Sequence, residues 1–191
     1  MNLPSQAEIA KALYGAWRLA RFDARGLEYF DRSLDGFWKS FFAAAIAAPA
    51  HFGLLALAGS DSPIAIGGLF GLMREAAIYA ISWLAFPLAM VYVARHLDRE
   101  ERFFDYIVAY NWASILQIVA FLLVSALSVG GVIPQTLAGF ATMAAFVAIL
   151  VYQWFIARTA LAIGAGAATA VVFFDMVVGL MVRLLGQSVA F

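Results

Sequence analysis

Five long apolar stretches, separated by short polar or glycine-rich connections, dominate the pattern of the chain. A helix needs about 20 mainly apolar residues to cross about 30 Å of hydrocarbon, and it has to satisfy its own backbone polar groups. The stretches that meet this length are 37–57, 73–94, 104–127, 136–157 and 161–182. The pattern therefore predicts an all-α fold, an integral membrane bundle of five transmembrane helices.

The N-terminal segment carries the pattern of a helix that lies along a membrane surface. In residues 4–22, Ser5 and Glu8 have the spacing of a capping box, and Ile9 and Leu13 begin an apolar face that continues with Trp17. Basic residues populate the rest of the helix, as in helices that lie in the headgroup layer. The candidate interfacial residues are Trp17, Lys11, Arg18 and Arg21. We predict an amphipathic interfacial helix, which acts either as an anchor over the cytoplasmic mouth of the bundle or as a sensor of anionic lipid.

These elements divide the chain into a cytoplasmic N-terminal segment at 1–35, a five-span domain at 36–185 and a short external tail at 186–191. The connection at 63–72 is too short and too rich in glycine to span, yet too apolar for a free loop. We expect it to be a re-entrant or a surface-lying segment.

Composition supports the membrane class. The chain has 191 residues, of which 65% are hydrophobic and 13% charged, whereas soluble domains are about a quarter charged. Twelve basic residues balance twelve acidic ones, so no net charge attracts nucleic acid. The absence of cysteine excludes disulfides and thiol chemistry. We expect no metal and no cofactor; the expected partners are the lipid bilayer and further subunits, in a homo-oligomer or a membrane complex.

The distribution of lysine and arginine predicts the orientation, because positive residues stay on the cytoplasmic side. Of the twelve such residues, only Arg74 and Arg183 fall at the ends of spans that would face outward. We expect the inner membrane of a bacterial cell, with a cytoplasmic N-terminus and a periplasmic C-terminus.

Four polar residues from four different spans fall at similar depth. At 1.5 Å per residue, Asp175 lies about 12 Å below Arg183 at the outer end of the fifth span. His51 and Ser82 share this level, and Gln117 lies somewhat deeper. An ionised aspartate inside the membrane costs about 2.5–3.5 kcal/mol, so it has to face protein or water. Asp175 with His51 predicts a proton or cation site; the alternative is a structural hydrogen bond between helices.

A second polar cluster is predicted nearer the cytoplasmic side. It comprises Asp105, Tyr106, Tyr110, Asn111 and Gln153. Its simplest interpretation is an interfacial aromatic belt with hydrogen bonds between helices.

The stretches "FFDYIVAYNWASIL" at 103–116 and "VYQWFIARTALAIGAGAATAVV" at 151–172 carry a family resemblance. The first resembles the tyrosine-bearing third span, and the second the turn between the fourth and fifth spans, of the Yip1 domain family. The resemblance covers about 36–185 and implies a cytoplasmic N-terminal segment, five spans and an external C-terminus. No proline follows the tyrosine of the third span, and the acidic motif of eukaryotic members is missing. We therefore carry over neither trafficking-GTPase binding nor any catalytic residue.

Two functions remain open. The first is a non-enzymatic, Yip1-like membrane scaffold or partner-binding subunit. The second is a small transporter or channel for protons or another cation, centred on Asp175. An intramembrane enzyme has the weakest case, since only Ser82 with His51 offers a nucleophile and a base.

Overall fold

Helices make up the protein, which a computed structural model describes over residues 3–188. Five helical segments are long and apolar enough to cross a membrane, so the predicted all-α membrane bundle is confirmed. The first segment joins two helices end to end, and the third includes the short 3-10 turn Glu100–Arg102 before its long helix. In chain order they are α2 (Leu34–Ser40) with α3 (Phe42–Leu57), α4 (Pro63–His96), α5 (Phe103–Val129), α6 (Gln135–Ala160) and α7 (Ala165–Ser188).

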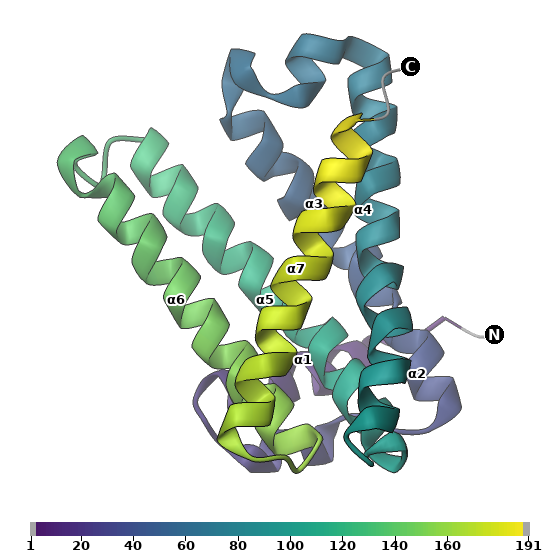
Figure 1. The fold of residues 1–191 in the computed structure, drawn as a ribbon. Coiled ribbons are helices and arrows are strands. Elements are labelled where there is room, and N and C mark those ends of the chain that lie inside the picture. The colour runs from purple at the N-terminus through teal and green to yellow at the C-terminus, as the bar shows by residue number, and fades with distance from the viewer. Residues whose placement is uncertain (1–2, 189–191) are drawn as a thin grey trace.

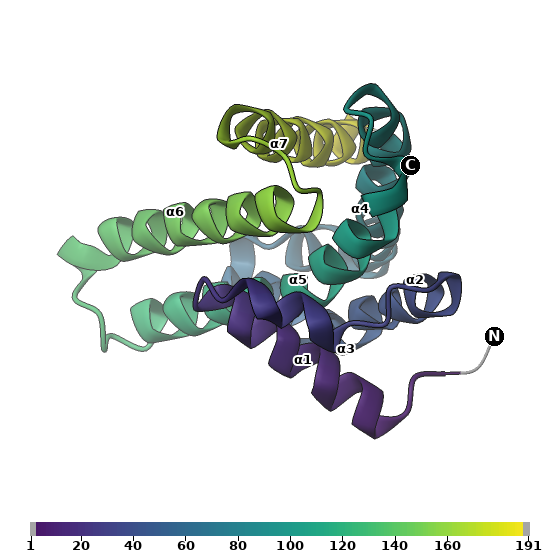
Figure 2. The ribbon, with the colours of Figure 1, turned by 90° about the horizontal axis from the view of Figure 1, so that it is seen from below.

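The helices divide into a packed end and an open end. We call the end near the N-terminal helix α1 (Gln6–Ala20) the inner end, and the end where α3 connects to α4 the outer end (Figure 1). Helices α4 and α7 lie side by side, and α3 packs along α5. The α5–α6 hairpin leans away from α7 toward the outer end, and its separation from α4 is also visible from below (Figure 2).

The buried side chains concentrate in the inner half of the bundle. Small residues on several helices are fully buried there, which lets the backbones approach closely. Examples are Ala43 of α3, Ala109 and Ala113 of α5, and Ala157 of α6. Large side chains such as Phe86 and Tyr106 fill the space between them. The outer half instead exposes large apolar residues, as expected of helices that face lipid.

Helix α1 packs across the inner parts of α5 and α6. Its Ser5–Glu8 capping box is present as predicted. Ala16 and Leu19 are buried, and the Tyr152 hydroxyl donates a hydrogen bond of 2.7 Å to the carbonyl of Ala16. The Lys39 ammonium, 2.7 Å from Glu8, is the main cause that lowers the pKa of that carboxyl to about 2. The helix is thus attached to the bundle both by packing and by charge.

The segment at 63–72 is helical and forms the start of α4. The backbone leaves the helical conformation at Gly68, whose φ of +53° is one that glycine adopts freely. The chain then crosses the outer end of the bundle before α4 descends (Figure 1), which fits the surface-lying alternative. Gly71 permits the tight bend, since a Cβ there would lie 2.2 Å from the carbonyl oxygen of Pro63.

Candidate functional site

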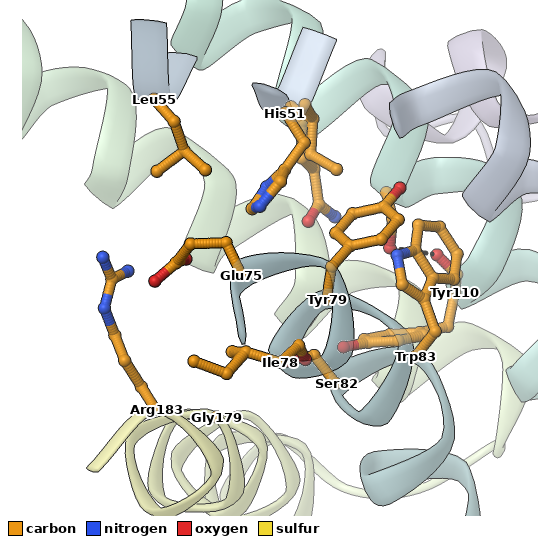
Figure 3. A pocket seen from close by; sticks show the side chains of 13 residues that line it. His51, Leu55, Glu75, Ile78, Tyr79, Ser82, Trp83, Tyr110, Gly179 and Arg183 are labelled. Atoms are coloured by element: carbon orange, nitrogen blue, oxygen red, sulfur yellow. Dashed lines mark hydrogen bonds between the residues drawn. The ribbon is translucent and has the colours of Figure 1, made fainter. Parts of the chain in front are cut away.

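A cleft of about 270 Å³ lies in the outer half of the bundle, between α3, α4, α5 and α7 (Figure 3). Each helix presents residues three or four positions apart, the spacing that puts side chains on one face. The polar residues of this lining are His51 from α3, Glu75, Tyr79 and Ser82 from α4, Tyr110, Ser114 and Gln117 from α5, and Arg183 from α7. The cleft begins where the packed core ends.

The Asp175 carboxylate lies directly below this cleft. It accepts a hydrogen bond of 2.9 Å from the hydroxyl of Tyr110, which lines the cleft. Asp175 is also one helical turn below Gly179, a lining residue on the same face of α7. The acid therefore faces the bundle rather than lipid, as its position in a membrane span requires.

Two glutamines continue the polar contacts from Asp175 toward the cleft. The side-chain amide of Gln153 lies against Asp175 and donates a hydrogen bond of 3.2 Å to the Oε1 of Gln117. Gln117 is 8% exposed, and its Nε2 has no hydrogen-bond partner among the described residues. The site thus holds a buried donor that is free to serve another acceptor.

The structure brings together most of the predicted polar layer, but Asp175 does not contact His51 as the sequence predicts. His51, Ser82 and Gln117 line one cleft, and Asp175 lies beneath it. The hydrogen-bond partner of Asp175 is Tyr110, which the sequence analysis had assigned to the second cluster, and not His51. The His51 ring instead packs against Tyr79, with ring centroids 4.5 Å apart.

The residues of the predicted second cluster do not lie together, because they point in three directions. Tyr110 and Gln153 belong with Asp175, and the buried ring of Tyr106 packs near Phe86 on the same side. The side-chain amide of Asn111 donates a buried hydrogen bond of 2.8 Å to the Ser40 hydroxyl instead.

Asp105, the remaining member, takes part in ion pairs at the inner end of α5. Its carboxylate lies 3.3 Å from the Arg32 guanidinium and 3.5 Å from that of Arg102. These pairs join the N-terminal segment to the connection between α4 and α5. Asp105 is therefore part of the inner surface and lies apart from the cleft.

The residues predicted for the interfacial helix have two different roles. Arg18 is held by Asp23 and by the Tyr29 hydroxyl, 3.0 Å away, and its hydrogen bond is the main cause that lowers the pKa of Asp23 to about 2. Lys11 and Arg21 are exposed, and Trp17 is 54% exposed on the side of α1 that faces away from the core. Trp17 therefore does not share the packed face of Ile9 and Leu13, contrary to the expected pattern.

Sequence reasoning gave too little weight to two charged residues at the cleft. Glu75 is only 5% exposed, and the Arg74 guanidinium lies 3.9 Å from it, beyond hydrogen-bond distance. The Arg183 side chain extends from α7 toward the Glu75 carboxylate, and the His51 ring points toward the same acid (Figure 3). The signal was present, since Glu75, Tyr79 and Ser82 share one helical face.

The structure does not place Ser82 and His51 as a hydrogen-bonded pair. The Ser82 hydroxyl donates to the backbone carbonyl of Ile78 at 2.7 Å, a bond within its own helix, so it is not paired with the His51 ring as a nucleophile would be. Within residues 3–188, no group of three histidine or acidic side chains is placed to hold a metal ion.

The five spanning helices make this chain a multi-pass membrane protein. No family model, no curated protein and no solved structure matches it. Any finer function therefore has to be argued from the cleft and its polar floor.

Proposed function

We propose that this membrane protein conducts protons or small cations, with Asp175 as the ion-binding group. The observation that carries the proposal is the placement of the carboxylate: it is hydrogen-bonded to Tyr110 inside the bundle, directly below an open cleft. Polar side chains of Gln153 and Gln117 connect it to the lining of that cleft. Asp175 thus lies one hydrogen bond beyond the lining of the cleft.

The energetics support a functional role for the acid. Inserting an aspartate in mid-membrane costs about 2.5–3.5 kcal/mol, whereas a hydrogen bond between membrane helices contributes about 0.6 kcal/mol on average. At this average, the contacts with Tyr110 and Gln153 together do not offset the cost of inserting Asp175. Acidic residues inside the membrane are typical of proton and ion pathways, where the carboxylate binds and releases the ion.

The test is ion flux into liposomes that contain the purified protein. A potassium gradient with valinomycin imposes a voltage, and a trapped pH dye or cation dye reports entry. We expect Asp175→Asn to reduce the flux at least tenfold. The matched control is Asp98→Asn in the inner connection, where Asp98 has a φ of +54° that asparagine also adopts. Wild-type flux no greater than that of empty liposomes, or equal flux in the Asp175 variant, would contradict the proposal.

A membrane scaffold or subunit is the second candidate, and the α5–α6 hairpin favours it. The outer half of α6 packs on α5 alone and leans away from α7 (Figure 1), and it exposes Leu137, Phe140 and Met143. Such a surface is available for another subunit within the membrane. Native mass spectrometry from detergent tests it: an oligomer dissociated by Phe140→Ser supports a subunit role, and a monomer opposes it. Membership of the Yip1 domain family stays a prediction.

The proposed orientation has the N-terminal segment in the cytoplasm of a bacterial cell and the C-terminal end of α7 in the periplasm. The distribution of lysine and arginine supports it. In this orientation the cleft faces the periplasm, and the packed inner half lies between Asp175 and the cytoplasm.

A further inference from the structure

We propose that the cleft binds a small zwitterionic solute, with its ammonium group at Glu75 and its carboxylate at Arg183. The inference rests on the proposed function, because the cleft is the route by which an ion would approach Asp175. It deepens that function by naming the class of molecule that the cleft takes.

The charges of the lining carry the argument. They are one carboxylate, from Glu75 on α4, and one guanidinium, from Arg183 on α7. The two side chains extend toward each other from different helices across the cleft (Figure 3). A solute with a net charge would leave one of these groups without compensation in a region of low dielectric constant, which is costly. A zwitterion matches both of these lining charges.

The buried donor of Gln117 gives a second, independent indication of a ligand. Gln117 lines the cleft, and its buried Nε2 has no hydrogen-bond partner among residues 3–188. Buried polar groups normally have a partner, and an orphaned donor calls for an acceptor from outside the protein. A hydroxyl or carbonyl oxygen on the solute would provide it.

The size and the walls of the cleft narrow the class further. Its volume of about 270 Å³ lies just below the range of about 300–1,000 Å³ that is usual for ligand pockets. This suits a solute of amino-acid size and excludes a nucleotide or a whole lipid. Tyr79 and Trp83, with ring centroids 6.0 Å apart, line the side from which Glu75 extends, and aromatic faces attract ammonium groups.

Equilibrium binding tests the inference with three related probes. The full chain in lipid nanodiscs is titrated calorimetrically with threonine, which is zwitterionic and carries a hydroxyl, then with ethanolamine and with lactate. We expect threonine to bind at least tenfold more tightly than either probe with a single charge. Glu75→Gln and Arg183→Gln should each weaken threonine binding at least tenfold. The matched controls are Glu101→Gln and Arg158→Gln, both at the inner end, and they should leave binding unchanged.

Arg183 is exposed, so Arg183→Gln is expected to fold. If Glu75→Gln fails to fold, the binding measured with Arg183→Gln decides the test. Absence of threonine binding, equal binding of the three probes, or unchanged binding in Arg183→Gln would overturn the inference. The result is separable from the proposed function. Ion flux that depends on Asp175 without threonine binding overturns only the zwitterion site, whereas threonine binding without flux supports the site and opposes ion conduction.

Discussion

The hydrogen bond between Tyr110 and Asp175 predicts a measurable coupling between α5 and α7. Tyr110→Phe removes the donating hydroxyl, and Asp175→Ala removes the acceptor, which lies 2.9 Å away. If the bond forms, the cost of losing both groups is smaller than the sum of the two single costs. The difference is the coupling energy of a double-mutant cycle.

The structure sets the expected magnitude of this coupling. Hydrogen bonds between membrane helices average about 0.6 kcal/mol with a maximum near 1.7, whereas bonds to charged acceptors contribute about 1.5–3 kcal/mol. Because Asp175 is only partly buried, we expect about 1 kcal/mol. That corresponds to a factor of about five in the ratio of folded to unfolded protein.

Unfolding of the purified variants by sodium dodecyl sulfate in bicelles measures this coupling. The control is a second cycle that combines Asp175→Ala with Tyr79→Phe in place of Tyr110→Phe. The Tyr79 hydroxyl donates to the carbonyl of Ala44 at 2.6 Å and not to Asp175. The control cycle should be additive to within about 0.5 kcal/mol. A Tyr110–Asp175 coupling as small as that of the control would refute the placement of the carboxylate against α5.

Three further predictions concern the inner half of the protein. Gly26→Ala should destabilise it by about 1–3 kcal/mol, because the new Cβ would lie 2.6 Å from a backbone oxygen of α1, whereas Gly139→Ala, with open space around it, should be neutral or stabilising in the same unfolding assay. Asn111→Ala removes a buried hydrogen bond of 2.8 Å to Ser40 and should lower the free energy of unfolding by about 1–3 kcal/mol. A decrease no larger than that caused by an alanine substitution at an exposed position would contradict the hydrogen bond. The pKa of Glu8 is lowered from 4.5 to about 2, so its ion pair with Lys39 stabilises the folded protein fully above pH 4.5 and is lost as the pH falls toward 2. The thermal midpoint of Glu8→Gln should therefore approach that of the wild type as the medium is acidified through this window, and a constant difference would contradict the assignment.

Depth in the membrane could be predicted from the sequence, because the rise per residue of a helix is fixed. The similar depth of His51, Ser82 and Gln117 followed from this, and these three residues line one cleft. Hydropathy was equally sufficient for the fold class, since five segments met the length that a bilayer demands.

The rotation of each helix about its own axis could not be predicted in this way. Tyr110 and Asn111 are neighbours in sequence but point about 100° apart around the helix, so one contacts Asp175 and the other Ser40. Which direction faces which neighbour is decided by packing between helices, for which the weak amphipathicity of these spans gives little signal.

The burial of Glu75 could not be predicted for a related reason. The predicted span began at residue 73, which placed Glu75 at a membrane boundary where long charged side chains usually extend into water. Helix α4 instead begins at Pro63 and bends at Gly68, so Glu75 lies well inside the helix and is buried. A bend of this kind depends on tertiary contacts such as the approach of Gly71 to Pro63, which hydropathy does not report.

The proposed function requires a water-accessible cleft that opens at the outer end and ends above Asp175. The wild-type chain has no cysteine, so single cysteines can be labelled without background by a charged, membrane-impermeant thiol reagent. Gly179 lines the cleft and has open space around it, as does Gly166 at the inner start of α7, whereas Ala109 is fully buried. We predict that Gly179→Cys reacts only from the side opposite the N-terminal segment, that Gly166→Cys reacts only from the other side, and that Ala109→Cys does not react. Lack of reaction at Gly179→Cys, or reaction from the side of the N-terminal segment, would contradict the account.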